Sequence, residues 1–243
     1  MLTLNPKYES LRAWLEQLPD TFFQQGEVIY DARNQIRVID GPDGKRYNVK
    51  RYCCPIWINR IVYTWFRSPK AVRAYYNALV LQQKGIATPE PIGYILCGKT
   101  TLRESFLITE QIPLAHRLYE WGDGVTEGRE DAMRSFGRFT ANMHNQDILH
   151  LDYSPGNILY DGQKGKWEFS VVDINRMHFG KVSIETGCAN MGRLWGEEPM
   201  YRFIAEGYAA ERHADSETCY RKMWQAHQDF WSKHKKPKEY TQA

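Results

Sequence analysis

The sequence predicts an α+β fold of two lobes, with an antiparallel sheet and a helix in the N-terminal lobe and a mostly helical C-terminal lobe. Apolar and polar residues alternate in short segments between residues 27 and 52, as they do in half-buried strands. From about residue 129 the apolar residues instead recur every three to four positions, which indicates amphipathic helices. Pro113 stands between the two patterns. We therefore expect an N-terminal lobe at residues 1–111 and a C-terminal lobe at 112–243.

Besides a helix within residues 56–67, the N-terminal lobe is predicted to hold two helices and five strands. Leu11, Trp14 and Leu18 share one face of the first helix, which Pro19 is expected to end. The first three strands should form an antiparallel meander, because the turn-forming residues Gly-Pro-Asp-Gly separate the last two of them. In order, the predicted elements are a helix at 8–18, strands at 27–30, 35–40 and 46–52, a helix at 69–84, and strands at 92–96 and 105–111.

The C-terminal lobe is predicted from a long helix over about residues 129–144. Its apolar face carries Ala132, Met133, Phe136, Phe139, Thr140 and Met143. Short strands are expected at 158–160 and 169–172, joined by a polar turn, and two or three helices between 189 and 234.

Composition excludes several classes of protein. The 243 residues are 42% hydrophobic and 25% charged, as in ordinary globular domains, and no apolar run approaches the roughly 18 residues of a membrane-spanning helix. Pro6 and Lys7 interrupt the stretch where a signal peptide would be apolar, so we expect a cytoplasmic protein. The five cysteines form no CxxC pair, and free thiols are expected in preference to a zinc site at Cys53 and Cys54.

A basic region lies between Lys45 and Pro89, with nine Lys or Arg residues and no Asp or Glu. Within it, residues 56–67 combine the apolar Ile58, Ile61 and Trp65 with arginines. This segment predicts a helix that packs on the N-terminal lobe; the alternative is peripheral contact with an anionic membrane, for instance the inner face of a bacterial inner membrane. Nucleic acid is not an expected partner, and the oligomeric state is not predicted.

The segment that carries chemistry is His150-Leu151-Asp152-Tyr153-Ser154-Pro155-Gly156-Asn157. Its pattern, H-x-D followed by Asn, is typical of phosphoryl transfer, where one carboxylate lies beside the attacking hydroxyl and one amide oxygen reaches Mg²⁺. Asp173 ends an apolar strand sixteen residues after Asn157, as a second metal ligand does. Lys50 lies near the end of the third predicted strand, where a kinase places its phosphate-binding ammonium. His150 is interpreted as a structural hydrogen-bonding residue.

These motifs, together with the segments 69–71, 85–93 and 171–176, resemble the lipopolysaccharide kinase (Kdo/WaaP) family. The resemblance covers about residues 28–193 and implies a protein-kinase-like fold and an ATP-dependent kinase acting on a sugar hydroxyl of a lipid-linked saccharide, such as the lipopolysaccharide inner core. It makes Asp152 the catalytic base, Asn157 and Asp173 the Mg²⁺ ligands and Lys50 the phosphate-binding lysine. We also expect the remaining contacts with ATP to come from Glu110, Ile112 and Ser154.

Several differences from protein kinases bear on the function. The turn at 31–35 lacks a glycine-rich loop, and the helix at 69–84 has no acidic residue to hold Lys50. Leu151 stands where regulated protein kinases have an arginine, and only 70 residues follow Asp173. We therefore favour a sugar kinase. The alternatives are an atypical serine/threonine protein kinase, a pseudokinase that acts as a binding or scaffold module, and a soluble small-molecule kinase.

Overall fold

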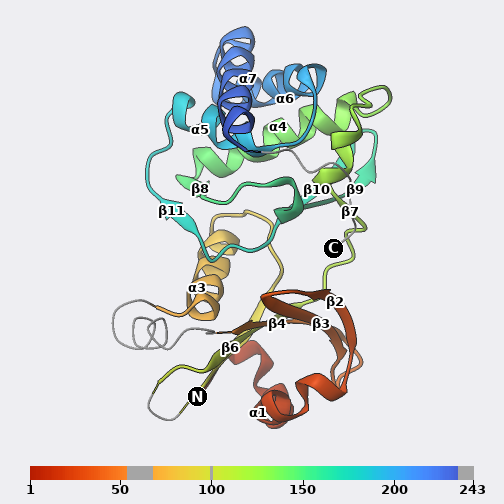
Figure 1. Cartoon of the computed structure of the whole chain (residues 1–243), viewed down its shortest axis with the longest axis vertical. Helices are drawn as coiled ribbons and strands as arrows, with labels where there is room; N and C mark the ends of the chain where they lie inside the picture. Colours follow the sequence, from red (N-terminus) through yellow and green to blue (C-terminus); the bar gives the residue numbers. More distant parts are fainter. Residues whose placement is uncertain (54–67, 99–100, 235–243) are drawn as a thin grey trace. The chain divides into compact units, whose positions relative to one another are not determined.

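A computed structural model describes residues 1–53, 68–98 and 101–234. The chain divides into two compact units. Among the described residues, the first unit lies within Met1–Gln83 and Thr88–Pro113, and the second lies within Lys84–Ala87 and Leu114–Gln242. The protein has an antiparallel sheet in its first part and mostly helices in its last part, which is the predicted α+β fold (Figure 1).

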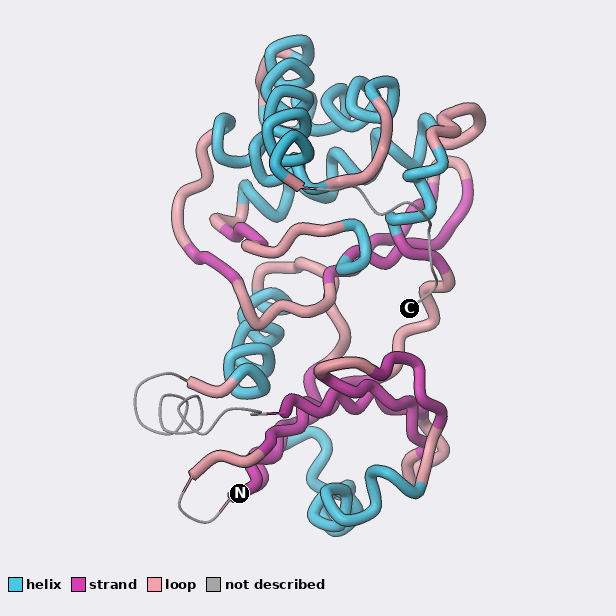
Figure 2. The backbone as a smooth tube through the Cα atoms, in the orientation of Figure 1, coloured by secondary structure: helices cyan, strands magenta, loops and turns pink. Residues whose placement is uncertain are grey.

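The first unit is built on a six-stranded antiparallel sheet with the strand order β1-β5-β6-β4-β3-β2. The strands are drawn in magenta in Figure 2. Strands β2, β3 and β4, which form one side of the sheet, are the predicted meander. The turn between β3 and β4 closes with the Gly41 N–H donating to the Lys45 carbonyl at 2.7 Å. Gly44 in this turn has a φ of 77°, which favours glycine. The strands are β1 (Leu2–Leu4), β2 (Glu27–Asp31), β3 (Asn34–Asp40), β4 (Arg46–Cys53), β5 (Pro91–Cys97) and β6 (Glu104–Glu110).

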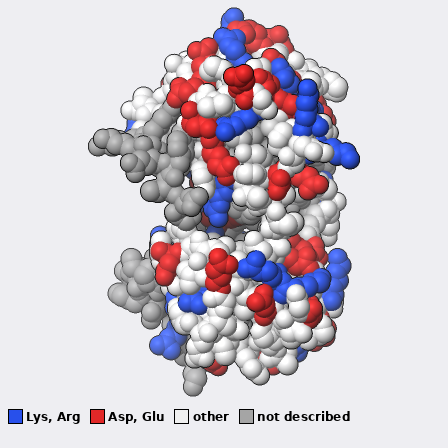
Figure 3. Space-filling view, turned by 90° about the vertical axis from the view of Figure 1, so that its right-hand side faces the viewer, with Lys and Arg blue, Asp and Glu red and all other residues white. Residues whose placement is uncertain are grey.

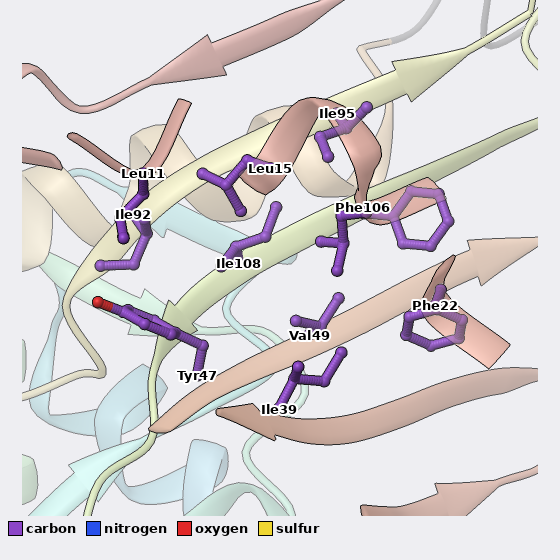
Figure 4. Close-up of a cluster of buried hydrophobic side chains, with 11 residues drawn as sticks. Leu11, Leu15, Phe22, Ile39, Tyr47, Val49, Ile92, Ile95, Phe106 and Ile108 are labelled. Atoms are coloured by element: carbon purple, nitrogen blue, oxygen red, sulfur yellow. The ribbon is translucent and has the colours of Figure 1, made fainter. Parts of the chain in front are cut away.

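One face of this sheet is covered by the N-terminal segment that contains α1 (Arg12–Thr21). Leu15 and Phe22 of this segment are fully buried against Val49 of β4 and Phe106 of β6 (Figure 4). Burying each such side chain contributes roughly 1.5–3 kcal/mol. Pro19 does not end the helix as predicted but lies inside it. The lost backbone bond of Pro19 costs only about 3 kcal/mol, which burial of the neighbouring Leu18 and Phe22 offsets.

The opposite face of the sheet packs against α3 (Lys70–Gln83). Here Tyr52 of β4 and Tyr94 of β5 contact Ala71 and Tyr75 of the helix. Because side chains alternate along a strand, Val49 faces α1 while Lys50 and Tyr52 share the α3 face. The predicted helix at residues 56–67, with its alternative membrane contact, lies outside the described residues.

The second unit is organised around α4, whose closest partner is α6 (Figure 1). The two helices approach at Gly137 and Gly207, where any Cβ atom would overlap the backbone of the facing helix. The helices are α4 (Glu130–Asn145), α5 (Ile184–Asn190), α6 (Glu198–Arg212) and α7 (Ser216–Lys233), with short 3₁₀ helices η3 (Leu118–Asp123), η4 (Pro155–Asn157) and η5 (Met191–Arg193).

Two small antiparallel sheets complete this unit. One has the order β10-β9-β7, and the other pairs β11 with β8. The strands are β7 (His116–Arg117), β8 (Ile148–His150), β9 (Ile158–Gln163), β10 (Lys166–Val171) and β11 (Met177–Phe179). The strands predicted at 158–160 and 169–172 correspond to β9 and β10, whereas β7, β8 and β11 were not predicted. They are two or three residues long and too short to show a period.

In the face drawn in Figure 3, each unit carries both basic and acidic side chains, and neither unit is covered by charges of one sign. Within the described parts of the chain, no helix is both long and apolar enough to cross a membrane.

Candidate active site

The H-x-D-x4-N segment forms a tight loop between β8 and β9. The Ser154 N–H donates to the Asp152 carbonyl at 2.8 Å, and the Asn157 N–H donates to the Ser154 carbonyl at 3.0 Å. The Asn157 side chain adds a third bond, because its Nδ2 donates to the same Asp152 carbonyl at 3.0 Å. These three hydrogen bonds hold Asp152 and Asn157 in one rigid turn. Pro155, at the start of η4, restricts the backbone of this turn further because its ring fixes φ.

Asp173 is brought to this loop by backbone pairing. The Val172 N–H donates to the Asn157 carbonyl at 2.9 Å, and the Leu151 N–H donates to the Arg176 carbonyl at 2.9 Å. The segment around Asp173 is thus tied to the catalytic loop on both sides. The structure brings together Asp152, Asn157 and Asp173, three of the residues that the sequence singled out.

The His150 ring is hydrogen-bonded both to the catalytic loop and to the segment that precedes Asp173. The Asp152 N–H donates to His150 Nδ1 at 3.1 Å, so Nδ1 carries no proton, and Nε2 must be the donor to the Val172 carbonyl at 3.0 Å. The side chain is fully buried, and burial lowers the pKa of His150. The Asn190 Nδ2 also donates to the His150 carbonyl at 3.0 Å. The predicted structural role of His150 is confirmed.

Asp173 has an unusual backbone. Its φ of 54° lies in the left-handed region, which costs a non-glycine residue of order 1–3 kcal/mol. The Asn175 Nδ2 donates to Asp173 Oδ1 at 2.5 Å, and the Asn175 side chain is buried. Such a conformation persists where surrounding contacts impose it, and it is common at active sites.

The Asp152 carboxylate is held by two arginines that sequence reasoning did not identify as site residues. Arg176 Nη2 lies 2.7 Å from Asp152 Oδ2, and Arg193 Nη1 lies 2.5 Å from Asp152 Oδ1. Arg176 lies in the segment 171–176, which carries part of the family resemblance, but an arginine at this position does not by itself indicate that it contacts Asp152. Arg193 lies 41 residues from Asp152 and carries no sequence signal.

The other residues expected to contact ATP are distributed over both units. Lys50 lies on the α3 face of the sheet, with Nζ 5.3 Å from the centre of the Tyr52 ring. The Glu110 carboxylate accepts from Lys45 Nζ at 3.0 Å and from the Tyr8 hydroxyl at 3.2 Å. Ile112 follows β6, and its carbonyl accepts from Gln111 Nε2 at 3.2 Å. Ser154 lies in the catalytic loop of the second unit, and the roles of all four residues remain predictions.

Comparison with known proteins identifies the family of this chain. A model of the lipopolysaccharide kinase (Kdo/WaaP) family matches residues 24–181, which is more than half of the chain. This chain belongs to the lipopolysaccharide kinase (Kdo/WaaP) family. As a member of it, the protein is a phosphotransferase of the lipopolysaccharide kinase class. The resemblance drawn from its motifs is confirmed.

Solved structures support the same fold. A structure described as WaaP in complex with acyl carrier protein matches with a TM-score of 0.62 and 16% identity, covering 96% of this chain and 97% of that chain. At this identity the likeness concerns the fold alone, which is therefore the protein-kinase-like fold of WaaP. Comparison with curated protein sequences gave no match.

The residues of this Kdo/WaaP family member also fit a magnesium ion. In the described residues, no three His, Cys, Asp or Glu side chains gather into a metal site of their own. Mg²⁺ at a kinase site needs only one or two protein oxygens, because waters and phosphates supply the rest. Asn157 Nδ2 donates its hydrogen bond to the Asp152 carbonyl, so Asn157 Oδ1 lies on the other side of the planar amide group. Asn157 Oδ1 and the Asp173 carboxylate are oxygen ligands of the kind that Mg²⁺ prefers.

Proposed function

We propose that this protein is an ATP-dependent kinase that phosphorylates a sugar hydroxyl of a lipid-linked saccharide, such as the lipopolysaccharide inner core. The observation that carries the proposal is the joining of Asp152, Asn157 and Asp173 into one hydrogen-bonded unit around the buried ring of His150. Family membership supports a lipopolysaccharide acceptor in general, and the sugar acceptor is the proposed refinement.

The proposed reaction uses few protein groups. The acceptor hydroxyl oxygen forms a bond to the γ-phosphorus of ATP while the bond to the β–γ bridging oxygen breaks and ADP leaves. Asp152 orients the hydroxyl and takes its proton. Asn157 and Asp173 would hold Mg²⁺, which when bound neutralises charge on the phosphates. Lys50 is proposed to bind phosphate, and the remaining nucleotide contacts are assigned to Glu110, Ile112 and Ser154.

We place the lobes at residues 1–111 and 112–243. Because ATP is the proposed phosphate donor, we place the reaction in the cytoplasm. Peripheral contact of residues 56–67 with an anionic inner membrane would bring the enzyme to its lipid-linked acceptor, as their apolar and basic composition suggests.

The test is the Asp152→Asn variant assayed with labelled ATP and extracted core saccharide. The amide keeps the size of the side chain and leaves the backbone bonds of the loop in place, so the fold and the ATP affinity should be preserved. Turnover should fall by about 10²–10⁴-fold, the usual contribution of a general base. The matched control is Asp147→Asn. Asp147 lies five residues before Asp152, its side chain is exposed, and its left-handed φ of 61° suits asparagine.

Unchanged turnover in Asp152→Asn would mean that the catalytic carboxylate has been misplaced. ATP binding without phosphate transfer to any saccharide or protein would favour the pseudokinase alternative instead. Transfer to proteins but not to core saccharide would favour an atypical protein kinase.

A further inference from the structure

The arginine pair on Asp152 is built from three separate segments of the second unit. Asp152 follows β8, Arg176 precedes β11 and Arg193 ends η5. Each carboxylate oxygen has its own arginine, Oδ1 with Arg193 and Oδ2 with Arg176. A general base for a neutral hydroxyl needs no such cations, so the pair requires another explanation.

The two guanidinium groups face solvent more than the carboxylate they contact. The Arg176 side chain is 54% exposed and that of Arg193 is 40% exposed, against 21% for Asp152. An arginine carries five N–H donors in a planar group. One nitrogen of each guanidinium contacts Asp152, which leaves donors of both arginines directed away from the carboxylate.

Arg193 is also held from its other side. Its guanidinium carbon lies 5.2 Å from the centre of the Phe230 ring of α7, within the range of a cation–π contact. The chain directly after Arg193 is fixed to the same helix, because Trp231 Nε1 donates to the Leu194 carbonyl at 3.2 Å. This guanidinium is therefore placed in advance, as a binding group must be if affinity is not to be lost in ordering it.

The formal charges leave a surplus at this position. The single negative charge of Asp152 meets two positive charges, so Asp152, Arg176 and Arg193 together carry one net positive charge. The nearby Asp173 carboxylate is not counted, because the proposed function assigns it to Mg²⁺. Paired guanidinium donors match the oxygens of a carboxylate or a phosphate, with which they form strong, directional hydrogen bonds.

We propose that Arg176 and Arg193 bind an anionic group, a carboxylate or a phosphate, that the acceptor saccharide carries close to the hydroxyl that is phosphorylated. This rests on the proposed function. Without acceptor both arginines contact Asp152. When the acceptor binds, their free donors take its anion, and the hydroxyl then lies beside Asp152. The arginines thereby select anionic sugars over neutral ones.

The test compares acceptors and variants in one kinetic experiment. Core oligosaccharide is used untreated, with its carboxyl groups reduced, or with its phosphates removed. For untreated acceptor, Arg176→Gln and Arg193→Gln should each raise the acceptor KM about tenfold to a hundredfold, as the loss of a charged hydrogen bond does, with the KM for ATP unchanged. Arg→Lys variants should recover part of this loss. The control is Arg221→Gln, because Arg221 is 74% exposed on α7.

The chemical treatment identifies the anion. If a carboxylate is bound, carboxyl reduction should raise the wild-type KM to the level of the variants and abolish the difference between them, while phosphate removal should not. If a phosphate is bound, the two treatments exchange outcomes. A fall in kcat of similar size with all three acceptors, at constant acceptor KM, would overturn the proposal, because the arginines would then act only on Asp152.

Calorimetric binding of untreated oligosaccharide separates this proposal from the proposed function, since it requires no turnover. Equal binding by the wild type and both glutamine variants, in an enzyme that phosphorylates the saccharide, would overturn the arginine site alone. Weaker binding by both variants, in an enzyme that transfers no phosphate to the saccharide, would support the anion site while the proposed kinase activity fails.

Discussion

The buried His144 makes the stability of the second unit depend on pH. Its side chain is 1% exposed on α4, and Nδ1 lies 3.0 Å from the Tyr208 hydroxyl. Burial, with a smaller contribution from the positive charge of Arg212, lowers the pKa of His144 to about 3. The folded protein therefore keeps this ring neutral through the whole range from pH 7.5 to 5.0.

The sign and size of the effect follow from proton uptake by the unfolded chain. Unfolded, the imidazole has its ordinary pKa of about 6.5. A base whose pKa is lowered by folding contributes stability above the unfolded pKa, and this is lost as pH falls toward the folded pKa. At about 1.4 kcal/mol per pH unit, the loss between pH 7.5 and 5.0 is about 2 kcal/mol. The pKa of His150 is also lowered, so this residue adds to the same loss.

We expect His144→Phe to reduce this pH dependence by about 2 kcal/mol. Urea unfolding followed by the helical circular dichroism signal, at half-unit steps of pH, measures the free energy of unfolding. Most carboxyl groups titrate below this range, so it reports mainly on histidines. The control is His178→Gln, since His178 is exposed on β11. The reasoning is refuted if the free energy of unfolding falls by as much between pH 7.5 and 5.0 in His144→Phe as in the wild type. This holds even if the variant is less stable at every pH.

Two further predictions concern the metal site and the helix packing. Asp173→Asn should remove the Mg²⁺-dependent part of ATP binding in calorimetry, because it takes a charged ligand from the proposed Asn157–Asp173 site; binding that ignores both metal and substitution would contradict the site. Gly137→Ala should lower stability by about 1–2 kcal/mol, since overpacking against the Ile204 carbonyl outweighs the gain of about 1 kcal/mol in helix propensity. A thermal scan should show a fall of about 2–8 °C. Gly156→Ala, whose Cβ meets nothing within 4 Å, is the control, and an equal shift in both would contradict the packing argument.

Elements that depend on near neighbours could be predicted from the amino-acid sequence. The alternation along β3 and β4 and the turn at Gly41–Gly44 predicted the meander, because pleat and turn chemistry are local properties. The helical period likewise predicted α4, and the order of Lys50, the H-x-D-x4-N loop and Asp173 led to the family. Each of these signals is contained in a few consecutive residues or in their order along the chain.

Contacts between side chains that are distant in the sequence could not be predicted in this way. The register of β8 with β11 brings Arg176 to Asp152, and packing of η5 on α7 brings Arg193 to its other oxygen. The protonation of His150 likewise follows from its two partners and not from its type. Pairings of this kind depend on how separate elements pack, and a change of one residue in register would turn each side chain to the opposite face. For that reason the sequence predicted the catalytic loop but not the cations that surround its carboxylate.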